Sequence, residues 1–62
     1  MGWVIAERRS NLYVAIFGGR EKLTSKKHAT RMGNVNVAQL WLEQLRRTYS
    51  PSTYTFEIEE VK

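Results

Sequence analysis

The sequence predicts a small α+β domain: an antiparallel or mixed sheet of three to four strands with one main helix packed on one face, in the order β-β-(β)-α-β. Three patterns predict this fold class. Two runs rich in β-branched and aromatic residues open the chain, one amphipathic segment has helical periodicity, and apolar residues alternate with polar ones near the C-terminus. The 62 residues suffice for a single domain, residues 1–62, and include no cysteine that could cross-link it.

The first two strands are predicted over residues 3–6 and 12–17, where β-branched and aromatic side chains prevail. The polar residues 8–11 between them favour a hairpin loop. Side chains alternate between the faces of a strand, so one face collects Trp3, Ile5, Leu12, Val14 and Ile16. The other face collects Val4, Ala6, Tyr13, Ala15 and Phe17. We assign the first set to the core because it is larger and more aliphatic, and a Gly-Gly pair then ends the second strand.

The stretch before the main helix allows two interpretations. In the first, Thr24 or Ser25 caps one turn of helix over residues 26–29, and residues 30–32 form a short strand that a Gly-Asn turn closes. In the second, a single helix runs over residues 25–32, with a glycine as its C′ residue. We favour the first interpretation, because the single helix would carry only two apolar side chains, too few for a core-facing stripe.

The main helix has the strongest pattern in the chain. Asn36 is placed to cap its N-terminus, with Gln39 three residues later as in a capping box, while Val35 and Leu40 are placed for a hydrophobic staple. Helical spacing brings five apolar residues onto one stripe: Ala38, Trp41, Leu42, Leu45 and Tyr49. Pro51 stops the helix, because it biases the preceding residue away from the α conformation.

The last strand is predicted within residues 52–61, where the period returns to two. One face carries Tyr54, Phe56 and Ile58. The other face carries Thr55, Glu57 and Glu59. This pattern is typical of a half-buried strand with a charged outer surface.

The residues needed for catalysis or metal binding are scarce. The chain has no aspartate, one histidine and six glutamates, and no cluster of ligands has zinc or calcium spacing. Glu57 and Glu59 lie roughly 7 Å apart on one strand face, a spacing that a glycosidase pair tolerates, but no apolar neighbour would raise the pKa of either. We therefore expect a non-enzymatic protein that uses no cofactor and no metal.

The positive charge of the chain is concentrated in its first half. The net charge is +4, and residues 1–31 hold seven Lys and Arg against two Glu, whereas residues 32–62 hold three against four. The seven cations of the first half are Arg8, Arg9, Arg20, Lys22, Lys26, Lys27 and Arg31. All fall in predicted loops or in the stretch before the main helix, where side chains can reach phosphates. The leading hypothesis is therefore a protein that binds nucleic acid, either DNA or RNA, through a basic loop surface.

A protein-binding surface is the alternative. If the helix covers only the assigned core face, then Val4, Tyr13 and Phe17 stay exposed on the other face of the sheet. Glu57 and Glu59 share that face and would repel a phosphate chain, which favours a protein partner, such as an acidic host protein that the chain inhibits or regulates, or a homodimer. The remaining possibility is that the stretch before the main helix folds over this face and covers it.

Several motifs together resemble small single-domain proteins encoded by bacteriophages and prophages. They are Trp-Val-Ile at 3–5, Tyr13, Leu-Thr-Ser-x-x-x-Ala at 23–29, Ala-x-x-Trp-Leu-x-x-Leu at 38–45 and Tyr-x-Phe-x-Ile-Glu-Glu-Val at 54–61. The resemblance implies a small α+β fold and an accessory role in a virus or mobile element, without implying an activity. The three-strands-then-helix order also loosely resembles the arm-type DNA-binding domains of tyrosine recombinases, from which the closing strand departs.

No part of the sequence indicates a membrane or a secretory route. No apolar run approaches the ~20 residues that span a bilayer. The first residues lack the basic region of a signal peptide, and the apolar stretch there is too short. We expect a cytoplasmic protein without membrane partners, located in the host cytoplasm if a phage encodes it.

Overall fold

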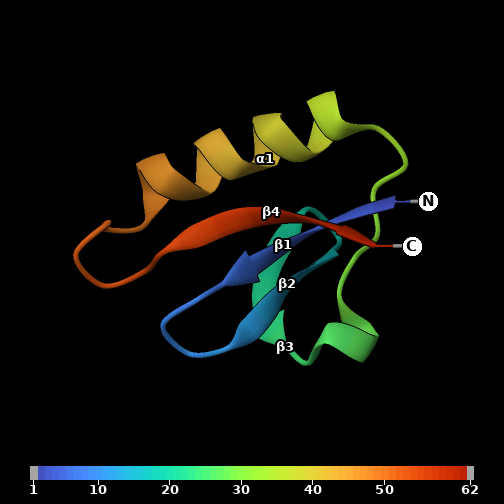
Figure 1. Ribbon diagram of the computed structural model, residues 1–62. Coiled ribbons are helices and arrows are strands. Elements are labelled where there is room, and N and C mark those ends of the chain that lie inside the picture. The colour runs from blue at the N-terminus through green and yellow to red at the C-terminus, as the bar shows by residue number, and fades with distance from the viewer. Residues whose placement is uncertain (1, 62) are drawn as a thin grey trace.

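The computed structural model describes residues 2–61, which fold into one antiparallel sheet with one α-helix packed on it (Figure 1). The elements in chain order are β1 (Gly2–Glu7), β2 (Leu12–Phe17), β3 (Arg20–Thr24), the 3₁₀ helix η1 (Lys26–His28), α1 (Val35–Thr48) and β4 (Phe56–Val61). The strand order across the sheet is β3-β2-β1-β4, and all pairings are antiparallel. The predicted α+β class is confirmed.

The central strand β1 pairs very differently with its two neighbours. With β4 it pairs over its whole length, from Gly2 opposite Val61 to Glu7 opposite Phe56. With β2 it pairs only beside the connecting loop, where Glu7 lies opposite Leu12 and Ala6 lies opposite Tyr13. Beyond that point the backbone groups of β1 and β2 bond to a different segment of the chain.

That segment is residues 30–32, and it connects the two strands. The N–H of Met32 donates to the carbonyl of Trp3 in β1 at 2.8 Å, and the N–H of Trp3 donates back at 2.8 Å. On the other side, the N–H of Thr30 donates to the carbonyl of Val14 in β2 at 3.1 Å, and the Thr30 hydroxyl accepts the N–H of Ile16 at 2.7 Å. The predicted single helical turn is present as η1, but the side chain of Ser25 makes no cap bond, and in place of the predicted strand over residues 30–32 only Met32 forms an isolated bridge, to Trp3.

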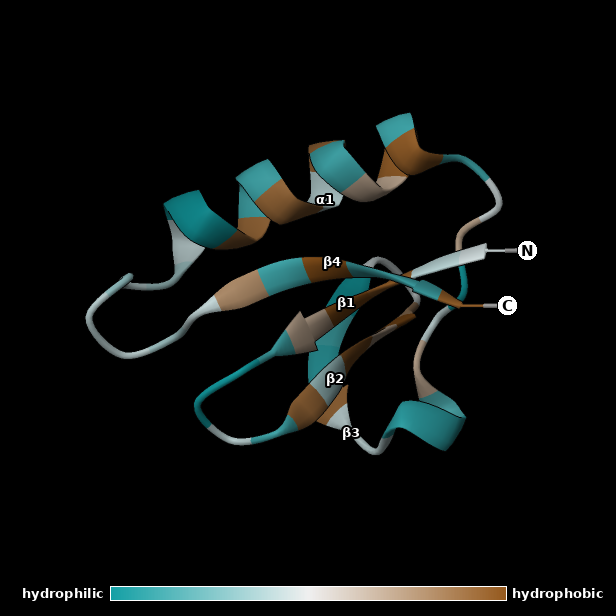
Figure 2. Cartoon of the chain, in the orientation of Figure 1, coloured by the Kyte–Doolittle hydropathy of each residue, from teal (hydrophilic) through white to brown (hydrophobic). Residues whose placement is uncertain are grey.

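The helix packs on β4 and β1, while η1 packs on β2 on the other side of the sheet (Figure 1). Hydrophobic residues recur at each turn of α1 (Figure 2). The buried residues Ile5, Val14, Met32, Ala38, Leu45 and Phe56 form the core cluster. Trp41, Leu42 and Tyr49 pack against this core, which confirms the predicted helix stripe, whereas Leu12, assigned to the core, is 36% exposed at the start of β2.

The structure contains a hairpin that the sequence reasoning missed. Gly18 and Gly19 have φ angles of 56° and 77° and turn β2 directly into β3. Glycine adopts this left-handed conformation without the steric cost of a Cβ, and two such residues in succession are typical of a tight type I′ turn. β3 has the sequence Arg-Glu-Lys-Leu-Thr, which is too polar to be recognised as a strand from hydrophobic alternation. Polar residues are common on a strand at the edge of a sheet, where β3 lies.

The start of α1 also differs from the prediction. The N-cap is Asn34, whose side-chain oxygen accepts the N–H of Asn36 at 2.7 Å, so the helix begins at Val35 and Asn36 is not the cap. Gln39 consequently lies outside the capping-box position, and Leu40 is 66% exposed and forms no staple. Both asparagines can cap; the extended backbone at residue 34, φ −136°, decides between them.

Candidate nucleic-acid interface

The seven predicted cations come from three separate places in the fold. Arg8 and Arg9 lie in the loop between β1 and β2, Arg20 and Lys22 on β3, and the other three at and after η1. All seven are exposed. They do not form one patch: two of them make ion pairs with glutamates of β4, and the other five do not.

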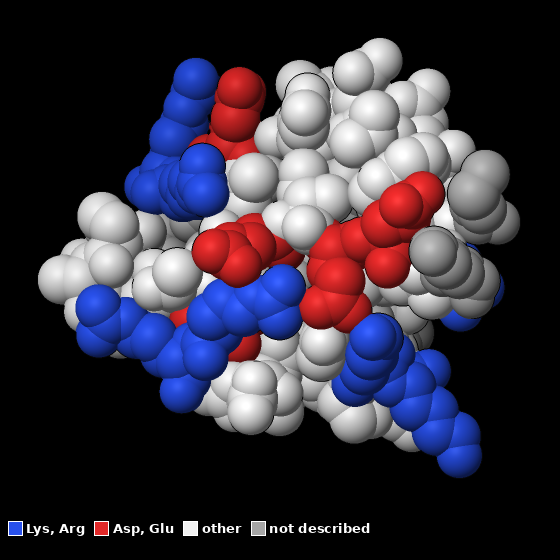
Figure 3. Space-filling model, in the orientation of Figure 1, with Lys and Arg blue, Asp and Glu red and all other residues white. Residues whose placement is uncertain are grey.

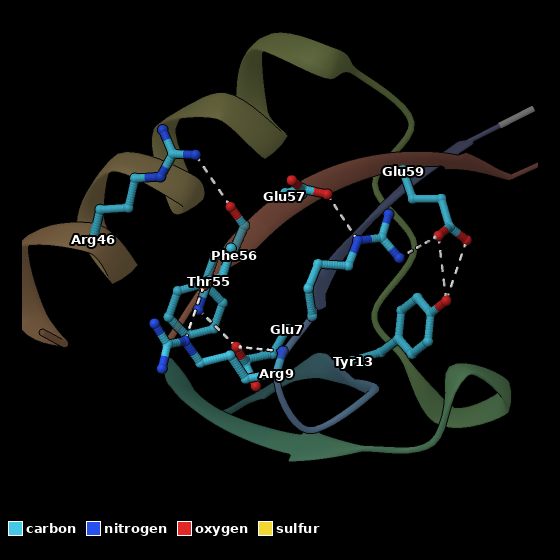
Figure 4. Close-up of polar contacts among 9 residues, drawn as sticks. Glu7, Arg9, Tyr13, Arg46, Thr55, Phe56, Glu57 and Glu59 are labelled. Atoms are coloured by element: carbon cyan, nitrogen blue, oxygen red, sulfur yellow. Dashed lines mark hydrogen bonds and ion pairs between the residues drawn. The ribbon is translucent and has the colours of Figure 1, made fainter. Parts of the chain in front are cut away.

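Arg8 and Lys26 are engaged by acidic side chains of β4. Arg8 Nε donates to Glu57 at 2.8 Å and its Nη1 to Glu59 at 3.2 Å, while Lys26 Nζ lies 2.6 Å from the other Glu59 oxygen. Tyr13 also donates its hydroxyl to Glu59, at 3.2 Å (Figure 4). The hydrogen bond from Lys26, aided by those from Arg8 and Tyr13, lowers the pKa of Glu59 against the opposing effect of burial. A phosphate would have to compete with these carboxylates for both cations.

This pairing follows from the order of the sheet. Because β4 lies beside β1, the charged face of β4 comes next to the loop that follows β1. Figure 3 shows the result: acidic and basic side chains lie next to one another on this face instead of forming a single basic surface. Of the seven predicted cations, Arg8 and Lys26 therefore lie in ion pairs with the acidic side chains of β4.

The remaining five cations make no ion pair within residues 2–61. Arg9 donates its Nε to the hydroxyl of Thr55 at 3.3 Å. The other four occupy the stretch between the second strand and the main helix, as Arg20, Lys22, Lys27 and Arg31. These four are the cations that the structure leaves best placed for an external anion.

The Phe17 side chain lies next to two of these four cations, Arg20 and Lys22. The register of β2 and β3 places Phe17 opposite Arg20, and Lys22 Nζ lies over the Phe17 ring, 5.5 Å from its centroid. Strand alternation puts these three side chains on the sheet face away from α1, because Ile16, the residue before Phe17, packs against the core. Phe17 is 62% exposed. We call Phe17, Arg20 and Lys22 the basic hairpin.

The predicted protein-binding surface does not form as a unit. Val4 is only 3% exposed, so the expectation of an exposed side chain there is wrong. It lies on the central strand β1, opposite Glu59 of β4 and beside Trp3, which bridges to Met32. Tyr13 is half-buried, bonded to Glu59, and has Lys26 Nζ 5.7 Å from its ring centroid. Only Phe17 of the three stays open, because η1 folds against β2 on this side.

The most unusual polar residue is one that the sequence reasoning did not single out. Glu7 is 1% exposed and accepts four hydrogen bonds: two from Ser10, at 2.8 Å from its N–H and 2.6 Å from its hydroxyl, one from the N–H of Thr55 at 2.6 Å and one from the N–H of Arg9 at 3.2 Å. Burial opposes the charge, but these bonds outweigh it and lower the pKa of Glu7 from 4.5 to about 2. All the donors belong to the protein, so this carboxylate holds the β1–β2 loop to the start of β4 (Figure 4).

A small pocket opens between α1 and β3. Its volume is about 90 Å³, and its lining combines Val14, Leu23, Leu45, Tyr49, Tyr54 and Phe56 with Glu21 and Lys22. The Tyr49 hydroxyl donates to Glu21 at 2.9 Å, and this bond raises the pKa of Tyr49. Within residues 2–61 no group of acidic or histidine side chains is arranged to hold a metal ion, and no helix there is long and apolar enough to cross a membrane.

Comparisons with known proteins add no assignment: no family model, curated protein or solved structure matches the chain significantly.

Proposed function

We propose that this chain is a non-enzymatic protein that binds nucleic acid through the basic hairpin, with Lys27 and Arg31 as further phosphate ligands. One observation supports this above the others. An exposed aromatic ring, Phe17, lies next to two cations of the neighbouring strand β3 that have no acidic partner within residues 2–61, on the sheet face that α1 does not cover. Such a combination of cations and an open ring suits a polyanion that also carries flat bases.

The charges of the hairpin determine how binding should depend on salt. Arg8 and Lys26 already have carboxylate partners, so they contribute less than the four cations between β2 and α1: Arg20, Lys22, Lys27 and Arg31. Four phosphate contacts would give a slope of about −3 to −4 when log affinity is plotted against log salt concentration. If the affinity does not change with salt concentration, nucleic acid does not bind through these cations.

The test is a fluorescence-anisotropy titration of labelled DNA and RNA at about 50 and 200 mM salt. Two charge reversals are compared: Arg20→Glu in the basic hairpin and Arg47→Glu, an exposed arginine near the end of α1. Both change the net charge equally. We expect Arg20→Glu to weaken binding by about 10-fold or more, from ~1.4 kcal/mol per lost charged contact, and Arg47→Glu to change it little. No binding at low salt, binding indifferent to salt, or an equal loss in both variants would contradict the proposal.

A protein partner is the second candidate function, and the outer face of α1 favours it. Val37 is 43% and Leu40 66% exposed, and Leu40, Trp41 and Gln44 line a shallow hollow on the helix surface. Neighbouring exposed apolar side chains of this kind mark protein contacts. The partner could be a host protein or a second copy, and its binding would depend on Leu40 and survive nuclease treatment. The accessory role in a phage or mobile element, which the motifs imply, stays a prediction.

A further inference from the structure

The Phe17 ring is positioned to offer one of its faces to a ligand. Lys22 Nζ lies over the ring, 5.5 Å from the centroid, which occupies one face. Since the side chain is 62% exposed, the ring has open area beyond this contact. Arg20, directly across the hairpin, lies beside it. An aromatic ring bordered by cations can stack on a nucleobase while the cations contact the phosphates on either side of it.

The other aromatic residue on this sheet face is not open in the same way. The Tyr13 hydroxyl bonds to Glu59, and Lys26 lies over the Tyr13 ring at 5.7 Å from its centroid. The surface therefore provides one stacking position, unlike sheets that stack two or three bases in a row.

We propose that the ligand is single-stranded or otherwise unpaired nucleic acid, one base of which stacks on Phe17 next to Arg20 and Lys22. This inference rests on the proposed function and specifies its ligand. In a duplex each base is covered by its neighbours above and below, so a ring that binds a base face selects loops, bulges, ends and single strands. Stacking on a phenyl ring is tolerant of sequence, because every base has a flat face.

The experiment compares three oligonucleotides of one length by anisotropy: a single strand, the same sequence as a blunt duplex, and a strand of abasic sites with the same phosphates. Wild type is compared with Phe17→Ala, Phe17→Tyr and the matched variant Leu40→Ala, which removes an equally exposed apolar side chain from α1. We expect the single strand to bind most tightly. Phe17→Ala should weaken that complex by about 5- to 150-fold, with Phe17→Tyr and Leu40→Ala close to wild type.

The outcomes separate the inference from the function on which it rests. If the abasic strand or the duplex binds as tightly as the single strand, or if Phe17→Ala leaves the affinity unchanged, the stacking inference is wrong while salt-dependent binding through Arg20 still stands. If no oligonucleotide binds, both proposals are wrong. Thermal melting of Phe17→Ala by circular dichroism confirms that the variant is folded, as the exposure of the side chain leads us to expect.

Discussion

Replacing Glu7 by glutamine tests how the fold is held at the end where two loops meet. The substitution keeps the size of the side chain and removes its charge. One of its two oxygens becomes an NH₂ group, which would face either the Ser10 donors or the N–H groups of Arg9 and Thr55. A buried donor therefore loses its acceptor, and the β1–β2 loop loses part of its connection to the start of β4.

The pKa of Glu7 sets the magnitude. The shift from 4.5 to about 2 corresponds to about 3 kcal/mol of stabilisation above pH 4.5, at ~1.36 kcal/mol per unit. At roughly 0.05–0.15 kcal/mol per residue, the whole domain of 62 residues has about 3–9 kcal/mol of stability. Loss of the Glu7 interactions should lower the melting temperature by about 10–25 °C, from ~4–8 °C per kcal/mol for a domain of this size.

The pH dependence has a definite sign. Because the folded pKa of Glu7 lies below the unfolded one, its contribution is complete above about pH 4.5 and is lost as the pH falls through about 2. The assay is urea denaturation followed by circular dichroism at several pH values between 7 and 2. Glu59, whose pKa is also lowered, adds a loss of the same sign that wild type and Glu7→Gln share.

The control is Glu43→Gln, which changes an exposed glutamate on α1. We expect wild type and Glu43→Gln to lose stability steeply below pH 4.5, and Glu7→Gln to begin lower and fall less. A Glu7→Gln protein within about 1 kcal/mol of wild type at pH 7, or one with an unchanged acid profile, would refute the reasoning.

Two further predictions concern α1. Asn34→Ala should destabilise the protein by ~1 kcal/mol through loss of the N-cap, while Asn36→Ala should cost much less, because it keeps the backbone N–H that the cap binds. The denaturation midpoints of the two variants measure the difference, and equal losses of stability would argue against Asn34 as the cap. Leu40→Gln should leave the stability within about 0.5 kcal/mol of wild type but abolish any protein complex that survives nuclease, as measured by pull-down and by light scattering for a second copy; a complex retained by Leu40→Gln would refute docking on the outer face of α1.

The structure also shows why part of the candidate site escaped prediction. The cations of the first half of the chain could be found by counting, and their exposure followed from their type. Their partners could not be found in this way, because the pairing of Arg8 with Glu57 joins residues 49 positions apart and depends on β4 lying beside β1. The local donors Arg9 and Ser10 do not by themselves reveal that Glu7 is buried, because the fourth hydrogen bond comes from Thr55 near the far end of the chain.

Periodicity alone determined the class of fold, the stripe of α1 and the alternation of β4, because these patterns arise within one element and reflect which side chains leave water. Only the tertiary structure decided that β3 follows a glycine turn, that residues 30–32 join β1 to β2, and that Val4 is buried. β3 follows a local glycine turn and was missed because its residues lack a hydrophobic alternation, whereas the last two features depend on contacts between segments distant in sequence, whose energies no local pattern contains. The same physical reason explains why the charges divide into paired and unpaired sets only once the sheet is assembled.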